Sequence, residues 1–254
     1  MVFNVCTEKT ETKIDAVMIT KNSFHPCLKE SLSSIIRNVP LNHLIVVDSF
    51  STDSTLKLLD EYKEKGVKVK IVQQRCNRGK AREIGIREVD TEWFAFVDSD
   101  VILAENWFLD ITKNIKPKVG AIEGNVNKQK ISPSGRAYTN CTLIKTSLVK
   151  DVKIPEEMRV LEDQYIRKHI EKKGYRWLKV SEPCSIHKST SDRKKDAFEV
   201  GRLSGKYGLL PFWKDFFVCF LIPVKLLRHG ESPSIYLNKL FGHLKGILER
   251  KSLW

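Results

Sequence analysis

Short apolar runs alternate with segments of helical periodicity along the first half of the chain, and this alternation limits the fold more than any other feature. The runs are Ile14–Thr20, His43–Asp48, Val67–Val72, Trp93–Val97 and Val119–Glu123. Between them, apolar residues recur three or four positions apart, as in a helix with one buried face. Strands that alternate with helices form βαβ units. The pattern therefore predicts an α/β fold with a mainly parallel central sheet flanked by helices.

The alternation weakens after residue 125, where three more elements are expected. Tyr138–Lys145 predicts a strand, Glu162–Lys173 a helix and Tyr175–Val180 another strand. Beyond them, Ser189–Lys195 (STSDRKK) is wholly polar and charged, so we place a domain boundary there. The chain is expected to divide into an α/β domain, residues 1–190, and a basic, amphipathic, helical C-terminal extension, residues 191–254.

The chain is basic, and its charge is uneven. In 254 residues, 44 Lys and Arg stand against 31 Asp and Glu, a net charge of +13. Residues 191–254 hold twelve of the cations and six of the acids, so they are more than twice as basic per residue as the rest. Such a charge suits nucleic acid, an anionic membrane or a phosphorylated ligand. A hydrophobic content of 41% excludes a disordered chain.

Three features bear on where the protein works. The six cysteines are scattered, with no C-x-x-C pair, which favours reduced thiols in the cytoplasm. The first 25 residues lack the basic start and apolar stretch of a signal peptide. The longest uncharged apolar run, Phe216–Val224, has nine residues, whereas a spanning helix needs ~20. We expect a cytoplasmic protein whose membrane contact, if any, is peripheral and on the cytosolic face.

Carboxylates follow two of the predicted strands, at the edge where parallel sheets bind ligands. Asp98-Ser99-Asp100 follows Trp93–Val97, and Asp48 closes an earlier run. Two carboxylates one residue apart can meet one Mg²⁺ or Mn²⁺, which also takes phosphate oxygens as ligands. The alternatives are an acidic turn for the pair and a helix cap for Asp48. In a functional role, Asp48 would accept a hydrogen bond from a base or ribose.

Three further segments carry polar residues that suit a site. Asn77–Arg82 (NRGKAR) opens a helix with three cations, and helix N-termini attract phosphate. Taken alone, this segment is better explained as a solvated basic turn. Glu162-Asp163 starts another helix, where acids also simply stabilise the helix dipole. His187, after an apolar stretch, is either a metal ligand or a structural histidine.

Two apolar stripes at helical spacing run through the extension. The first consists of Phe212, Trp213, Phe216, Phe217, Phe220 and Leu221, with Lys214, Lys225 and Arg228 beside it. The second consists of Leu237, Leu240, Phe241, Leu244, Ile247 and Leu248. Aromatic residues with basic flanks suit a helix lying in a membrane surface, so we expect peripheral membrane contact through residues 209–228. The second stripe is expected to dock on the α/β domain, and a homodimer contact is a third option.

The order of these motifs resembles that of family 2 glycosyltransferases with the GT-A fold. The resemblance covers roughly residues 14–190, and its segments are Ala16–Asn22 (AVMITKN), Leu44–Thr55 (LIVVDSFSTDST), Asn77–Gly85 (NRGKAREIG), Phe94–Asp100 (FAFVDSD) and Leu161–Gly174 (LEDQYIRKHIEKKG). It implies a GT-A, Rossmann-like sheet, a nucleotide-diphosphate sugar donor and an inverting transfer. It also implies a divalent cation, Mn²⁺ or Mg²⁺, as cofactor.

The resemblance assigns the chemical roles residue by residue. Asp163 matches the catalytic base of the family's Glu-Asp pair. Asp98 and Asp100 match its D-x-D motif, with Asp100 the more direct metal ligand. His187 lies where some relatives place a further metal ligand.

Seven residues are expected to bind the donor. Asp48 would hold uracil or another base, and Arg82 matches the family's nucleotide-binding arginine. The full set is Thr20, Asn22, Asp48, Lys80, Arg82, Asp98 and Ser99.

The chain departs from the family pattern at two places. Many relatives have a Gly-Gly pair in the acceptor-side segment, where this chain has Thr139-Asn140-Cys141-Thr142. This difference leaves the form of the acceptor pocket open. Ser23 stands where an acid is usual, and this matters less.

The leading hypothesis is a metal-dependent inverting glycosyltransferase that acts on a hydroxyl of a glycan or a lipid-linked acceptor. A polyprenyl-phosphate glycosyl transferase is the nearest alternative, but a phosphate acceptor is already ionised and needs no base. A sugar nucleotidyltransferase should carry a Gly-rich phosphate loop near its N-terminus, and this chain has none. A protein that binds nucleic acid is the least favoured, because the aromatic residues of the tail cluster in apolar stripes instead of alternating with cations.

Overall fold

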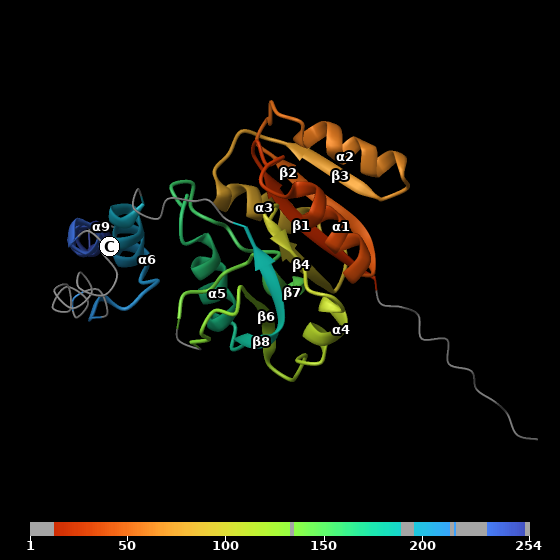
Figure 1. The fold of residues 1–254 in the computed structure, drawn as a ribbon. Helices are drawn as coiled ribbons and strands as arrows, with labels where there is room; N and C mark the ends of the chain where they lie inside the picture. Colours follow the sequence, from red (N-terminus) through yellow and green to blue (C-terminus); the bar gives the residue numbers. More distant parts are fainter. Residues whose placement is uncertain (1–12, 133–134, 189–195, 214–215, 217–232, 252–254) are drawn as a thin grey trace, which may run out of the picture.

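An eight-stranded sheet forms the centre of the protein in the computed structural model, which describes residues 13–132, 135–188, 196–213, 216 and 233–251 (Figure 1). Its strands are β1 (Ile14–Thr20), β2 (Leu41–Asp48), β3 (Val69–Gln73), β4 (Trp93–Val97), β5 (Val101–Ile102), β6 (Val119–Val126), β7 (Cys141–Lys145) and β8 (Arg176–His187). The helices are α1 (Leu28–Asn38), α2 (Thr55–Glu64), α3 (Arg78–Glu88), α4 (Trp107–Thr112), α5 (Glu162–Lys172), α6 (Ala197–Tyr207) and α9 (Pro233–Lys251), with a 3₁₀ turn at Thr146–Leu148.

The strand order is β3-β2-β1-β4-β7-β6-β8-β5. β1, β2, β3 and β4 pair in parallel, as the alternation with helices predicts, and β6 and β8 are also parallel. β7 runs antiparallel to both β4 and β6, because no crossover helix separates it from β6 along the chain. The predicted α/β fold is confirmed, with a parallel first half and a mixed second half.

Element boundaries differ from the predicted ones in the second half. β7 begins at Cys141 instead of Tyr138, because residues 138–140 leave the sheet. β8 continues past the predicted Val180 to His187. Its last residues pair with the two-residue strand β5, which the sequence did not predict. A strand of two residues is too short to show a period.

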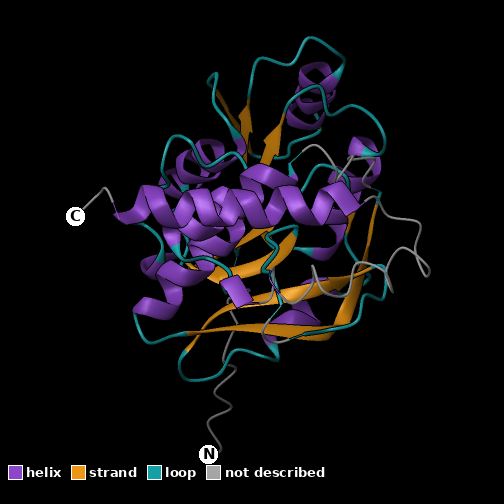
Figure 2. Cartoon of the chain, turned by 90° about the vertical axis from the view of Figure 1, so that its left-hand side faces the viewer, coloured by secondary structure: helices purple, strands orange, loops and turns teal. Residues whose placement is uncertain are grey.

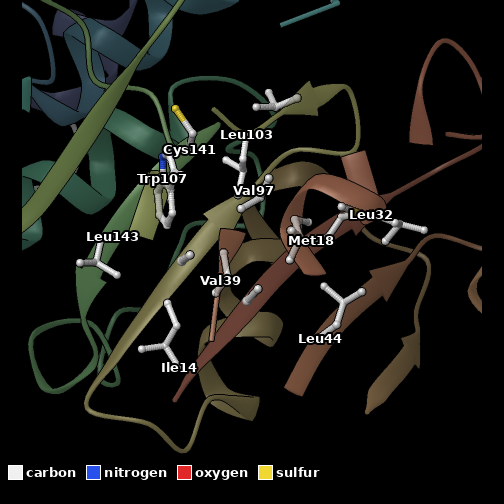
Figure 3. Close-up of a cluster of buried hydrophobic side chains, with 14 of the residues drawn as sticks. Ile14, Met18, Leu32, Val39, Leu44, Val97, Leu103, Trp107, Cys141 and Leu143 are labelled. Carbon is white, nitrogen blue, oxygen red and sulfur yellow. The ribbon is translucent and has the colours of Figure 1, made fainter. Parts of the chain in front are cut away.

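Both faces of the central strands are buried. Ala16 and Met18 of β1 pack on one face, together with Leu32 of α1. Val17 packs on the other face with Ile86 of α3. Figure 3 shows part of the first cluster, which reaches across the sheet to Leu143, Trp107 and Cys141. Consecutive strand residues point to opposite faces, so a strand buried on both sides needs an unbroken apolar run.

Helices α6 and α9 pack against each other through glycines. Gly201 and Gly205 of α6 face Gly242 and Gly246 of α9. A Cβ atom on Gly201 would lie 1.9 Å from the Lys239 carbonyl oxygen, so only glycine allows this approach. Figure 2 shows α9 as a long helix lying across the near face of the molecule.

The apolar stripe of α9 points away from this glycine contact. Leu237, Phe241, Leu244 and Leu248 are 40%, 59%, 43% and 67% exposed. The prediction that this stripe docks on the α/β domain is therefore wrong for these four residues, because α9 contacts α6 with its glycine face.

Only the start of the other stripe can be placed. Trp213 and Phe216 are exposed, and the Phe212 ring lies 5.3 Å from that of His243. The remaining members, Phe217, Phe220 and Leu221 with the flanking cations Lys214, Lys225 and Arg228, lie outside the described residues. In the described part of the chain, no helix is long and apolar enough to cross a membrane.

Glu157 connects α6 to the α/β domain. Its Oε1 accepts hydrogen bonds from Lys206 Nζ and Tyr207 Oη, both at 2.6 Å, and its Oε2 accepts one from Arg202 Nη1 at 2.9 Å. Although burial opposes ionisation, these donors lower the pKa of Glu157 from 4.5 to about 2. The charged carboxylate therefore stabilises the contact above pH 4.5, and that contribution is lost as the pH falls through 4.5 toward 2.

Replacing Glu157 with Gln should loosen α6 at neutral pH. Charge-assisted hydrogen bonds are lost, so we expect the free energy of unfolding to fall by about 1–3 kcal/mol and the thermal midpoint by roughly 2–8 °C. The difference between E157Q and the wild type should shrink as the pH falls below 4.5. Circular dichroism melts from pH 7 to pH 3 measure both effects. Glu156→Gln, an exposed neighbour, is the matched control, and an equal loss in that variant would contradict the assignment.

Candidate active site

A cavity of about 430 Å³ opens at the carboxyl ends of β1 and β4 and beside the start of α3. This is the sheet edge at which the strand-end acids predicted a ligand site. Five of the predicted site residues line it: Thr20, Arg82, Asp98, Ser99 and Asp100.

Arg82 lies at the centre of the site. Only 3% of the residue is exposed, and its guanidinium sits 5.1 Å above the ring of Phe96. Its Nη2 donates to Asp98 Oδ1 at 3.0 Å, and its Nε lies 3.5 Å from Glu162 Oε1 and 3.3 Å from Asp163 Oδ1. One buried cation thus joins the D-x-D motif to the Glu-Asp pair, although 64 residues separate Asp98 from Glu162 along the chain.

The charges of this cluster depend on one another. Burial lowers the pKa of Arg82, but the three carboxylates outweigh it and hold that pKa above its usual value. Burial raises the pKa of Asp98, and Arg82 opposes the rise. Burial also raises the pKa of Glu162, and the adjacent Asp163 raises it further. Without the guanidinium, two buried carboxyl groups, Glu162 and Asp163, and the half-buried Asp98 would lose their shared counter-charge.

Asp163 is buried, does not line the cavity, and contacts the rest of the site through Arg82. Its Oδ1 accepts a hydrogen bond from Thr139 Oγ1 at 2.6 Å and also faces Arg82. Both contacts fall on the same oxygen, so the carboxylate is held in one orientation. The first turn of α5 supplies this position, as the sequence predicted for the start of that helix.

Asp100 and His187 come together from distant parts of the chain. The pairing of β5 with β8 sets Val101 opposite His187, and His187 Nε2 lies 3.2 Å from Asp100 Oδ2. Adjacent ligands of an octahedral Mg²⁺ with bonds of ~2.1 Å are about 3 Å apart, so the two atoms have the spacing of neighbouring metal ligands. In the described residues, no three His, Cys, Asp or Glu side chains form a metal-binding group. The residues fit a cation that takes its other ligands from water and substrate phosphate.

The Asp48 carboxylate is held in place by its neighbours. It is fully buried, and its Oδ1 accepts hydrogen bonds from Thr20 Oγ1 at 2.8 Å and from Ser51 Oγ at 2.5 Å. Its Oδ2 accepts from the Ser51 backbone N–H at 2.8 Å and from Gln73 Nε2 at 3.5 Å. Within this structure the carboxylate organises the loop after β2, and it does not line the cavity.

Two other predicted donor residues also lie off the cavity wall. Lys80 Nζ pairs with Glu83 Oε1 at 2.9 Å, on the next turn of the same helix. Asn22 has a positive φ of 49° and accepts a hydrogen bond from the Thr52 backbone N–H at 2.8 Å. Asn22 thus shapes the rim through the loop after β2.

Sequence reasoning left several lining residues out of its set. Arg78, the first residue of α3, lines the cavity, whereas Lys80 does not. Ser49, the residue after Asp48 in the chain, also lines it. Both are neighbours of predicted residues, so the motifs gave a signal. Arg159 and Asp196 also line it. They come from irregular segments without a motif, and no sequence signal marked them.

Comparison with known proteins agrees with this geometry. The sequence profile of glycosyl transferase family 2 matches residues 15–179, well over half of the chain. The chain belongs to glycosyl transferase family 2. The family predicted from the motifs is confirmed.

A curated relative of this family 2 chain is the poly(ribitol-phosphate) beta-N-acetylglucosaminyltransferase TarS of Staphylococcus aureus. It is 28% identical over 146 residues, which cover 48% of this chain and 25% of TarS. The chain therefore matches only about a quarter of the length of that relative.

Solved structures share the fold. S. aureus TarS 1–349 in complex with UDP-GlcNAc is 20% identical, with a TM-score of 0.57 over 93% of this chain and 73% of that chain. The mannosyltransferase PcManGT from Pyrobaculum calidifontis, in complex with GDP-Man and Mn²⁺, is 16% identical, with a TM-score of 0.64 over 94% of this chain and 73% of that chain. The predicted GT-A fold is confirmed.

Replacing Arg82 should destabilise the protein more than replacing an exposed cation of the same helix. Arg82→Met removes the counter-charge of two buried carboxylates and of the half-buried Asp98, and we expect a loss of about 3–5 kcal/mol in the free energy of unfolding. Arg82→Lys keeps the charge but not the fork of donors and should lose less. The exposed Arg78→Met is the control. Urea titrations measure these free energies. Equal losses for R82M and R78M would show that the Arg82 cluster does not stabilise the fold.

Proposed function

We propose that the protein is a metal-dependent inverting glycosyltransferase that moves a sugar from a nucleotide-diphosphate donor to an acceptor hydroxyl. The observation that carries the proposal is the contact of Arg82 with both Asp98 and Asp163, which joins the D-x-D motif on the cavity wall to a candidate base. Membership of glycosyl transferase family 2 supports it. So do the UDP-GlcNAc and GDP-Man complexes of the structural neighbours.

The donor diphosphate would lie against the start of α3. Arg78 is exposed at the first helical position, and the first backbone N–H groups of a helix attract phosphate. Asn77 caps this helix by accepting a hydrogen bond from the Lys80 backbone N–H at 2.9 Å. Thr20 and Ser99 would contact the nucleotide from the ends of their strands.

A divalent cation would be held by Asp100 and His187, with Asp98 close by. The Mn²⁺ of the PcManGT complex supports a cation of this kind. Such an ion, when bound, neutralises the charge that develops on the leaving diphosphate. Asp98 is already fixed by Arg82, so its position does not depend on the ion.

The transfer itself is a single displacement at the anomeric carbon. The acceptor oxygen forms a bond to that carbon as the bond to the diphosphate oxygen breaks, and the nucleoside diphosphate leaves with the electron pair. The acceptor proton passes to Asp163, a general-base role. Because Thr139 and Arg82 contact its Oδ1, Asp163 would present Oδ2 to the acceptor.

Asp163→Asn should separate binding from chemistry. The amide keeps the shape of the carboxylate but cannot accept the proton, so we expect transfer to fall by about 10²–10⁴-fold while binding of UDP or GDP with Mn²⁺ stays within twofold. Calorimetry measures nucleotide binding, and turnover of UDP- and GDP-sugars measures transfer. Asp100→Asn should instead weaken nucleotide binding in the presence of Mn²⁺. Full transfer in D163N would remove its role as base, and a wild type that binds none of these nucleotides would remove the whole proposal.

We also propose that the C-terminal extension, residues 191–254, holds the enzyme on the cytosolic face of a membrane. Trp213 and Phe216 are 57% and 43% exposed, and the exposed stripe of α9 adds further apolar surface. The extension carries a net charge of +6 from twelve cations and six acids, which suits anionic lipid.

Vesicle binding tests this placement. The wild type should sediment with vesicles of phosphatidylglycerol and phosphatidylcholine, less with phosphatidylcholine alone, and less at high salt. Replacing Trp213 and Phe216 with Ser should release most of it. Leu109→Ser on α4, which removes a side chain that is 61% exposed elsewhere, is the control and should leave binding unchanged. Equal sedimentation of all three proteins would contradict the proposal.

A further inference from the structure

A second cavity, of about 190 Å³, is lined by Tyr138 and Asn140 and is distinct from the donor cavity. It is formed by the end of β6, residues 129–132 and 135–136 of the following loop, and β8, and the two cavities have no lining residue in common. At ~30 Å³ for each water molecule, it holds about six waters, which is the space of a small polar ligand. We call it the Asn140 cavity.

Residues 138–140 connect this cavity to the reacting centre. The Asn140 carbonyl oxygen accepts a hydrogen bond from the Asp98 backbone N–H at 3.0 Å. Thr139 Oγ1 donates to Asp163 Oδ1 at 2.6 Å. A ligand in the Asn140 cavity would therefore lie beside the wall that positions the candidate base.

The Asn140 side chain is an unsatisfied polar group in the cavity wall. The residue is 6% exposed, and its Oδ1 is buried without a hydrogen-bond partner in the described part of the chain. A buried amide without partners is costly unless a ligand or water supplies them. An amide offers both a donor and an acceptor, the combination that suits a hydroxyl group.

The charge of the cavity is positive. Lys130, Arg136 and Lys179 line it against one acid, Glu123. Glu123 is already satisfied, because Lys179 Nζ lies 3.1 Å from its Oε1 and Trp177 Nε1 donates to its Oε2 at 2.7 Å. The balance of two positive charges matches the −1.5 to −2 of a phosphate monoester near neutral pH, about as closely as side chains allow.

Arg136 is the group most available to an anion. Its Nε is buried without a hydrogen-bond partner in the described residues, and its guanidinium lies 5.7 Å from the centre of the Tyr138 ring. Tyr138 is 40% exposed and lines the cavity, so its ring offers a face to the carbon skeleton of a ligand. Arginine with free donors is well suited to phosphate oxygens.

We propose that the Asn140 cavity is an acceptor subsite for a phosphate-bearing polyol, with the phosphate on Arg136 and a hydroxyl on Asn140. This rests on the proposed glycosyl transfer, for which it names the class of acceptor. The phosphate is a recognition group, and a separate free hydroxyl of the same molecule attacks the donor.

Binding of glycerol 3-phosphate to the full chain, without donor, tests the subsite directly. We expect the wild type to bind it more tightly than either glycerol or inorganic phosphate. Arg136→Gln and Asn140→Ala should each weaken binding about tenfold or more. Lys128→Gln, which removes a nearby charge outside the cavity, should leave binding within twofold. Thermal melts check that both cavity variants are folded. If N140A is unfolded, R136Q alone still tests the subsite.

The same proteins separate this proposal from the proposed function. UDP or GDP binding with Mn²⁺ should be unchanged in R136Q, because the donor cavity lies elsewhere. If nucleotides fail to bind the wild type but glycerol 3-phosphate binds through Arg136, the transferase proposal fails, and the cavity stands only as a binding site for a phosphate-bearing polyol. The subsite is overturned if glycerol 3-phosphate does not bind, if R136Q and K128Q weaken it equally, or if inorganic phosphate binds as tightly as glycerol 3-phosphate.

Discussion

A buried guanidinium organises the site and the segments around it. Arg82 cannot stay charged in the interior unless carboxylates reach it, and none of its three partners belongs to its own helix. Asp98 comes from the end of β4, while Glu162 and Asp163 come from the first turn of α5. The cost of burying the charge therefore favours a structure in which the end of β4 and the start of α5 meet at α3.

Helix α3 brings Arg82 to this position because it lies unusually close to its neighbours. A Cβ atom on Gly85 would lie 2.4 Å from Val17 Cγ1, so this glycine lets the helix rest directly on β1. On its other side, a Cβ atom on Gly79 would lie 2.4 Å from the Met158 carbonyl oxygen. Two glycines thus fit the helix between the sheet and the segment before α5, and the spacing N-R-G-K-A-R-E-I-G becomes a packing requirement as well as a phosphate motif.

Sequence periodicity predicted the parallel half of the sheet and the acids at its edge, since each depends on residues that are neighbours in the chain. It could not predict β5, whose two residues pair with the distant Ile186 and His187. Nor could periodicity predict that the Asp48 carboxylate accepts hydrogen bonds from Thr20 of β1 and from Ser51 in the loop after β2. Periodicity reports which face of an element is buried, whereas these outcomes depend on contacts between segments far apart in sequence.

The chain departs from its family's usual Gly-Gly pair in the segment that contacts both the candidate base and the Asn140 cavity. Glycines would leave bare backbone, but Thr139 reaches the Asp163 carboxylate and the Asn140 side chain lines the cavity. Tyr138 donates its backbone N–H to Glu123 Oε2 at 3.2 Å, which ties the segment to the floor of the Asn140 cavity. Three consecutive residues therefore fix the positions of the candidate base, the D-x-D turn and a polar pocket relative to one another. A change of acceptor in this chain would have to pass through them, because any shift of the segment moves Asp163 with it.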